Sequence, residues 1–409
     1  MGYFKDTVKG VSWMGALRVL TRIIAFAKIA ILARLLNPAQ FGIYGIAALV
    51  LAFLEIITET GINVFFIQEE GDIKKFINTA WIVSIARGVL ISLVIVLFSP
   101  LISGFFKSPD SYKLILAISV VPLIKGFINP AVVKFQKELQ FNKEFVLRVT
   151  VFSIDAVVAV VVAVLTKSAV SLVWGLIVGA ITEVILSFVF IKPRPVFSFQ
   201  SDYAKKVIER GKWVTAYSGL NYLFENGDGI AIGRLMNTAS LGLYQMAYKI
   251  SSLPISEVAE IFIKVTFPVY RKIAGDFERL KKAFSKTMLT ICLLVIPFGL
   301  IFFLFPKEVV LTILGDKWLA AVPVIRVLAV FGIIRALLKS GFALFLAVKK
   351  QEYVTFVTLA GVFGLGITII PLVQKYGILG AAYSALTGAI VSVPVFLFYL
   401  NKVYKTFRQ

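Results

Sequence analysis

The chain has 409 residues, of which 59% are hydrophobic and 16% are charged, and its formal net charge is +21. Soluble domains contain about 25% charged residues, so this chain has too little polar surface to cover a water-soluble core. It has no histidine and a single cysteine, Cys292, which excludes histidine-based catalysis, an internal disulfide and a thiolate or imidazole metal site. We expect a polytopic membrane protein that is not an enzyme, with no catalytic residue, cofactor or metal. Because the positive-inside rule and anionic lipids account for the positive charge, we expect no nucleic-acid partner.

Twelve stretches are apolar over the roughly 20 residues that a transmembrane helix needs. In chain order they lie near residues 12–35, 41–67, 78–105, 113–133, 146–166, 169–191, 213–235, 241–263, 287–306, 320–347, 353–373 and 378–401. The segments on the side of the two termini hold roughly three times as many Lys and Arg residues as those on the other side. This asymmetry predicts a multi-pass protein of the cytoplasmic membrane with both termini in the cytoplasm.

A sequence motif recurs 200 residues apart. Residues 33–47 read ARLLNPAQFGIYGIA and residues 233–247 read GRLMNTASLGLYQMA. The repeated positions include Arg34, Asn37, Gly42 and Tyr44 in the first copy and Arg234, Asn237, Gly242 and Tyr244 in the second. We read them as structural residues at a short turn between two helices. The repeat predicts two six-helix halves in parallel orientation, an N-lobe of residues 1–192 and a C-lobe of residues 213–409, joined by a cytoplasmic linker of residues 193–212.

Several segments resemble the polysaccharide-transporter family of the MOP superfamily. They are the repeated motif, GINVFFIQ at the end of the second predicted span, PVYRKIAGDFERLKKAF after the eighth, GDKWLAAVPVIRVLAVFGI entering the tenth and YGILGAAYSALTGAI in the twelfth. The resemblance covers nearly the whole chain. It implies the two-lobed MOP fold, which multidrug MATE exporters share, and the activity of flippases that carry lipid-linked oligosaccharides for O-antigen, capsule or teichuronic acid.

Cations gather in the predicted spans of the first half. Arg18, Arg22 and Lys28 lie in the first span, Arg87 in the third and Lys125 in the fourth. An ionisable side chain inside a membrane is costly, so each one needs a partner or a function. One interpretation is a cavity that receives a pyrophosphate group, because arginine pairs bidentately with phosphate oxygens. The alternative is that Arg18 reaches the headgroups and that the others pair with Glu55, Glu59 or Asp155.

The seventh predicted span has the opposite polarity. Asn221, Glu225 and Asp228 share one helical face within about 60°. Asn221 extends the predicted substrate cavity. Two carboxylates one turn apart in a dry environment cannot both ionise cheaply, so the pair is a candidate for proton or sodium coupling. A salt bridge from either acid to a first-span cation, which would act as a gate or a structural tie, is the alternative.

Together these features predict a flippase that moves a polyprenyl-pyrophosphate-linked oligosaccharide from the cytoplasmic to the outer leaflet by alternating access. Coupling to H+ or Na+ is left open, as is association with polysaccharide polymerase or assembly proteins. The main alternative is a MATE-like, cation-coupled exporter of small organic molecules, which shares the architecture. A membrane-embedded polymerase or acyltransferase is disfavoured, because the chain has neither a large outer loop nor a His/Asp pair.

Overall fold

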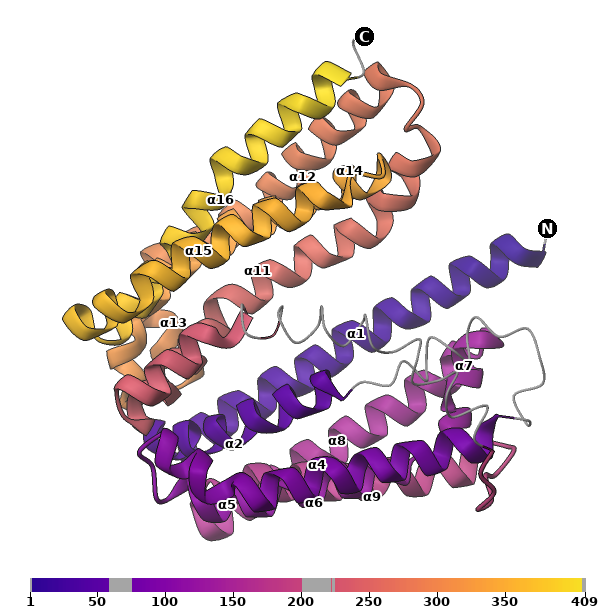
Figure 1. The fold of residues 1–409 in the computed structure, drawn as a ribbon, viewed down its shortest axis with the longest axis vertical. Helices are drawn as coiled ribbons and strands as arrows, with labels where there is room; N and C mark the ends of the chain where they lie inside the picture. Colours follow the sequence, from indigo (N-terminus) through magenta and orange to yellow (C-terminus); the bar gives the residue numbers. More distant parts are fainter. Residues whose placement is uncertain (1, 59–75, 201–221, 223–224, 407–409) are drawn as a thin grey trace. The chain divides into compact units, whose positions relative to one another are not determined.

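The computed structural model describes residues 2–58, 76–200, 222 and 225–406, and these residues are mostly helical and contain no strand (Figure 1). The chain divides into two compact units, Met1–Asn226 and Gly227–Gln409. The division falls inside the predicted seventh span. Most of the predicted linker, residues 201–212, lies outside the described residues, so the predicted lobe boundaries stay a prediction.

The helices of the first unit begin with α1, a 34-residue helix that is the longest in this unit. The elements are α1 (Gly2–Leu35), α2 (Pro38–Ile57), α4 (Ile77–Phe105), α5 (Ser111–Ile118), α6 (Val120–Gly126), the 3-10 helix η2 (Pro130–Val133), α7 (Lys134–Lys137), α8 (Phe141–Thr166) and α9 (Val170–Phe190). The most extensive packing within the unit joins α8 to α9 and to α1, followed by α4 to α6. Aromatic and aliphatic side chains around Phe76, Phe135 and Leu147 form a buried core between α4, α7 and α8.

Residues after α9 remain attached to the first unit. Ile191 is buried in the core just described. The amide of Val196 donates to the side-chain oxygen of Asn78 at 2.9 Å, and the amide of Gln200 donates to the hydroxyl of Thr79 at 3.1 Å. The described part of the predicted linker is therefore an extended strap bound to the start of α4.

The second unit begins within the helical residues 225–235. It continues with α11 (Thr238–Lys272), α12 (Phe277–Leu304), α13 (Pro306–Ile313), the 3-10 helix η3 (Asp316–Ala321), α14 (Val322–Ala347), α15 (Gln351–Tyr376) and α16 (Ile378–Thr406). α15 packs along α16, and α11 along α14. The α15–α16 approach depends on small residues, since a Cβ at Gly388 would lie 2.7 Å from the carbonyl oxygen of Gly361. Such close backbone contact is typical of membrane helices.

Eight of the described helices are long and apolar enough to cross a membrane. The pair Ser111–Gly126 and Pro130–Lys137, bent by 70°, raises this number to nine if it is one span. α1 and α11, with 34 and 35 residues, also have the necessary length. The all-α polytopic class is confirmed, and each predicted span overlaps helical residues. The total of twelve stays a prediction, because residues 59–75 and most of 201–224 are outside the description.

Candidate functional site

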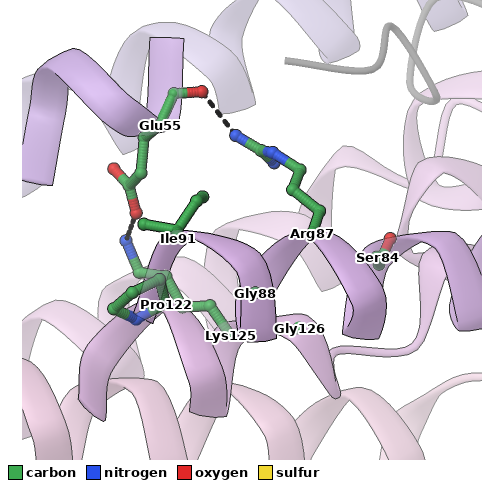
Figure 2. Close-up of a pocket in the computed structure, with 8 residues that line it drawn as sticks. All are labelled: Glu55, Ser84, Arg87, Gly88, Ile91, Pro122, Lys125 and Gly126. Atoms are coloured by element: carbon green, nitrogen blue, oxygen red, sulfur yellow. Dashed lines mark hydrogen bonds and ion pairs between the residues drawn. The ribbon is translucent and has the colours of Figure 1, made fainter. Parts of the chain in front are cut away.

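A polar pocket lies between α2, α4 and α6 inside the first unit (Figure 2). Its volume is about 100 Å3, and its lining includes two cations, Arg87 and Lys125, and one carboxylate, Glu55. Lys125 Nζ lies 3.1 Å from Glu55 Oε1. Arg87 donates through Nη2 to the main-chain oxygen of Glu55 at 2.5 Å and through Nε to the hydroxyl of Thr58 at 3.1 Å. Two of the predicted cavity cations are therefore brought together, and the end of α2 joins them.

Glycines explain why these two cations meet. Arg87 is followed by Gly88 and Lys125 by Gly126, and the two glycines lie where α4 crosses α6. A Cβ at Gly88 would come within 2.4 Å of the carbonyl oxygen of Pro122, and one at Gly126 within 3.0 Å of the carbonyl oxygen of Ser84. The helix backbones thus touch at the crossing, and each cation sits one residue before its contact point.

Lys28 has a different partner. Its Nζ lies 2.8 Å from both carboxylate oxygens of Asp155 on α8, and the two side chains are only 12% and 13% exposed. α9 closes over this pair, since a Cβ at Gly175 would lie 2.5 Å from Asp155 Oδ1. Lys28 is thus engaged in an ion pair inside the helix packing, as the alternative interpretation of the first-span cations describes.

Arg18 and Arg22 lie one turn apart on α1. Arg22 is exposed and Arg18 is half-buried. Thr21, between them on the helix, turns its hydroxyl back to the main-chain oxygen of Leu17 at 2.7 Å. Both residues take part in further interactions. The structure leaves these two arginines on a different part of α1 from the buried Lys28.

Asp228 is a buried carboxylate of the second unit, 7% exposed. Its Oδ2 accepts a hydrogen bond of 2.5 Å from the hydroxyl of Tyr244 on α11, and its Oδ1 accepts one of 2.7 Å from the amide of Gly229. The positive charge of Arg335 on α14 acts on Asp228. Arg335 in turn donates to the hydroxyl of Tyr248, one turn after Tyr244. Helix residues from three segments thus build one polar cluster.

The structure says less about Asn221 and Glu225, the other two polar residues that share the predicted face of the seventh span. Glu225 is half-buried and takes part in a further interaction. Asn221 lies outside the described residues. The neighbouring Tyr222 belongs to the first unit, where its hydroxyl donates to the main-chain oxygen of Leu49 on α2 at 2.7 Å.

The repeated motif has the same local geometry in both copies. Asn37 precedes α2 and its side chain accepts from the amide of Gln40 at 2.9 Å, while Asn237 precedes α11 and accepts from the amide of Ser240 at 2.9 Å. Asparagine at this position satisfies an amide that the helix itself leaves unpaired. Gly42 and Gly242 are both buried.

The arginines of the motif differ in exposure, since Arg34 is exposed and Arg234 half-buried. The tyrosines have a related environment. Tyr44 is close enough to Asp155 for the carboxylate charge to act on it, and Tyr244 is bonded to Asp228. In each unit an aspartate therefore acts on the motif tyrosine, the partly buried Asp155 on Tyr44 and the buried Asp228 on Tyr244.

The sequence profile of the family described as "Polysaccharide biosynthesis protein" matches residues 31–323, which is more than two thirds of the chain. The chain belongs to this family. Among its relatives is the teichuronic acid biosynthesis protein TuaB of Bacillus subtilis (strain 168), 26% identical over 407 residues, which cover 96% of this chain and 81% of TuaB.

Two solved structures share the fold of this polysaccharide biosynthesis protein. One is the lipid II flippase MurJ, with a TM-score of 0.72, 14% identity, and coverage of 96% of this chain and 89% of MurJ. The other is a multidrug resistance MATE transporter of the MOP superfamily, with a TM-score of 0.71, 14% identity and coverage of 95% of both chains. The predicted family and the predicted MOP fold are confirmed. The fold is common to flippases and drug exporters, so it does not distinguish between them.

In this family member the structure gives two acidic side chains specific partners that the sequence alone does not identify. Glu55 is the carboxylate of the pocket, and Asp155 holds Lys28. Both acids stand in apolar stretches, which already marks them as exceptions that need a reason. Their partners lie 70 and 127 residues away along the chain, a separation that only the packed helices reveal.

Proposed function

We propose that this protein is a flippase that moves a polyprenyl-pyrophosphate-linked oligosaccharide from the cytoplasmic to the outer leaflet. Membership of the polysaccharide biosynthesis family carries this proposal. The relative TuaB is named for teichuronic acid biosynthesis, which places such a relative in the assembly of a surface polysaccharide. The positive pocket between α2, α4 and α6 adds support, because a cargo with a pyrophosphate head needs cations along its route.

Charge separates this proposal from export of organic cations. A cation exporter needs acidic side chains to replace the water around its cargo, whereas a pyrophosphate carrier needs basic ones. The charged residues that line the pocket are two cations, Arg87 and Lys125, and one carboxylate, Glu55. The helix α1 of the same unit adds Arg18 and Arg22. Arg18 and Arg22 on α1 are our first contacts for the pyrophosphate, and Lys28, paired with Asp155, holds α1 against α8.

The transport cycle in this proposal uses two lobes that alternate access, with both termini in the cytoplasm. The lipid tail stays in the bilayer while the sugar and pyrophosphate cross within protein. Asp228 is our candidate for coupling to H+ or Na+, with Glu225 three positions before it, because a buried carboxylate with neutral hydrogen-bond donors is costly to ionise and is stabilised by a proton or a cation. Polysaccharide polymerase or assembly proteins would act on the delivered product.

The test is flipping of a fluorescent polyprenyl-pyrophosphate oligosaccharide by the full-length protein in proteoliposomes, with and without imposed proton or sodium gradients. We expect Arg22→Ala to lower the initial rate at least tenfold. Lys307→Ala, which removes an exposed cation of α13, is the matched control and should leave the rate unchanged. Asp228→Asn should make any gradient effect disappear. A wild-type protein that flips no lipid under any gradient but exports an organic cation would overturn the proposal.

A further inference from the structure

The strap that follows α9, residues 193–200, exposes large apolar side chains. Val196, Phe197 and Phe199 are 60%, 76% and 57% exposed, on a segment that is not helical. Single exposed apolar residues are common on proteins, but three within four positions form a patch that needs a partner. These residues belong to the predicted cytoplasmic linker, a segment that the sequence alone places in water.

The strap is fixed where two helices end. α9 ends at Phe190, two residues before the strap, and α4 begins at Ile77. The amides of Val196 and Gln200 donate to side chains in the first turn of α4. Both helices are long and apolar enough to cross a membrane, so their ends mark the headgroup region of a bilayer. The strap therefore lies at the depth of the headgroups.

Trp81 of α4 joins the strap to the helices beside it. Its ring centroid lies 4.8 Å from that of Phe197, 5.9 Å from that of Phe188 on α9 and 6.4 Å from that of Phe127. The indole N–H donates to the main-chain oxygen of Phe127 at 3.0 Å. Phe127 and Phe190 are themselves 37% and 52% exposed. Because tryptophan is enriched at membrane–water interfaces, this aromatic cluster supports the same depth for the strap.

The charges beside these rings have one sign. Lys192 and Arg194 are exposed, and residues 184–200 contain no Asp or Glu. Arg194 donates through Nε to the main-chain oxygen of Phe188 at 3.1 Å, which holds its guanidinium beside the end of α9. Exposed apolar side chains next to cations match a bilayer surface with anionic headgroups, where the apolar groups enter the acyl boundary and the cations meet phosphates.

We propose that the strap is an interfacial anchor: Phe197 and Phe199 insert between the headgroups of the adjoining leaflet, and Lys192 and Arg194 bind its anionic phosphates. A protein partner fits less well, because three side chains cover less than the about 800 Å2 that each partner of a stable interface buries. The anchor ties the start of the connection between the two units to the membrane surface. It does not depend on which cargo the protein moves.

Depth-dependent quenching of a fluorescent label tests the anchor. In a Cys292→Ser protein, which has no other cysteine, Phe199→Cys is labelled with the fluorophore NBD. The full-length protein is reconstituted in vesicles of phosphatidylcholine and phosphatidylglycerol. We expect lipids with a doxyl group near the headgroup to quench this label at least threefold more strongly than a label at Gly275→Cys.

Gly275 is the matched control because it is exposed in the turn between α11 and α12, and a Cβ there meets nothing within 4 Å. The charged segment 276–286 separates it from the apolar part of α12. Iodide in the water should quench the Gly275→Cys label more strongly than the strap label. If iodide quenches both labels equally and doxyl lipids do not favour the strap, the strap lies in water and the proposal fails. A strap label shielded from both quenchers would indicate a protein contact and overturn the lipid assignment.

A label at Ser198→Cys keeps all three apolar side chains. It replaces Phe199→Cys if that protein does not fold, which the melting temperature shows, and the same outcomes apply. Adding Phe197→Ser and Phe199→Ser to Ser198→Cys should lower the quenching by doxyl lipids at least twofold, and unchanged quenching would contradict insertion of the rings.

Lipid composition tests the charged part of the anchor. At the same content of doxyl lipid, quenching of the Ser198→Cys label should be weaker in phosphatidylcholine alone than in vesicles that also contain phosphatidylglycerol. Lys192→Gln should reduce this difference, because it removes one of the two cations. Equal quenching in both kinds of vesicle would overturn the assignment to anionic headgroups.

Discussion

Each of the two units holds an aspartate near the tyrosine of the repeated motif, and the two carboxylates have different partners. In the first unit Asp155 lies against Lys28, and Tyr44 is near the pair. In the second unit Asp228 accepts from the hydroxyl of Tyr244 and from a main-chain amide. Position 228 follows position 28 by the same 200 residues that separate the motif copies, so an acid stands where the first unit has a lysine.

The two sites differ in whether the aspartate has a cationic side chain bonded to it. A tight Lys–Asp pair closed over by glycine contacts is neutral as a whole and has little reason to change during a transport cycle. The carboxylate of Asp228 instead accepts hydrogen bonds from neutral donors, and the positive charge of Arg335 acts on it from α14. Similar local sequence thus lies beside an Asp–Lys ion pair in the first unit and beside an aspartate with neutral hydrogen-bond donors in the second.

The largest effect should come from breaking the tie of the first unit. Lys28→Met leaves Asp155 buried without its cation, and we expect a loss of about 3–5 kcal/mol in the free energy of unfolding. SDS titration of the detergent-purified protein measures it. The double variant Lys28→Met/Asp155→Leu removes both charges and should recover most of the loss. If Lys28→Met is as stable as the wild type, the Lys28–Asp155 pair does not stabilise the fold.

Removing the hydroxyl of Tyr44 or of Tyr244 compares the two aspartate sites directly. Tyr244→Phe leaves an oxygen of Asp228 without its side-chain donor, so we expect a loss of about 1–3 kcal/mol in unfolding free energy. Tyr44→Phe should cost less, because both oxygens of Asp155 already accept from Lys28. The same titration compares the two variants. Equal losses would contradict the different roles assigned to the two hydroxyls.

The helix contact beside Asp155 should show the next effect. Gly175→Ala places a Cβ 2.5 Å from Asp155 Oδ1 and 2.7 Å from its main-chain oxygen, so α9 must move away from α8. We expect a loss of about 1–3 kcal/mol, as for other overpacked contacts. Gly227→Ala is the matched control, because nothing lies within 4 Å of its new Cβ. If the Gly175→Ala and Gly227→Ala proteins have the same melting temperature, the inference of a close α8–α9 contact at Gly175 is wrong.

The smallest effects belong to the helix caps of the motif. Asn37→Ala and Asn237→Ala each remove a side-chain acceptor from a helix start, with an expected cost of about 1 kcal/mol. The two costs should be similar, because each Asn side chain accepts from one amide at 2.9 Å, and the bond from the main-chain amide of residue 37 to Gln40 survives the substitution. Melting temperatures of Asn37→Ala, Asn237→Ala and the wild type compare the two caps. A loss at one cap with none at the other would contradict this expectation.

Much of the fold could be predicted from the sequence, because a bilayer allows so few solutions. Apolar stretches long enough to cross must be helices, and their positions coincide with the helices described here. The family followed from short motifs read along the chain, and the profile match to residues 31–323 confirms it. The caps at Asn37 and Asn237 are local features as well, since a cap depends only on the residues of one turn.

The pairing of charges needed the tertiary structure. The sequence offers three equivalent candidates for one cavity, Lys28, Arg87 and Lys125. In the packed helices Lys28 forms an ion pair with Asp155, whereas Arg87 and Lys125 both contact Glu55. The physical reason is that helix periodicity determines the face of a residue but not the neighbour of that face. Which helices cross, and where glycines such as Gly88 and Gly175 let them touch, decides which residue each cation contacts.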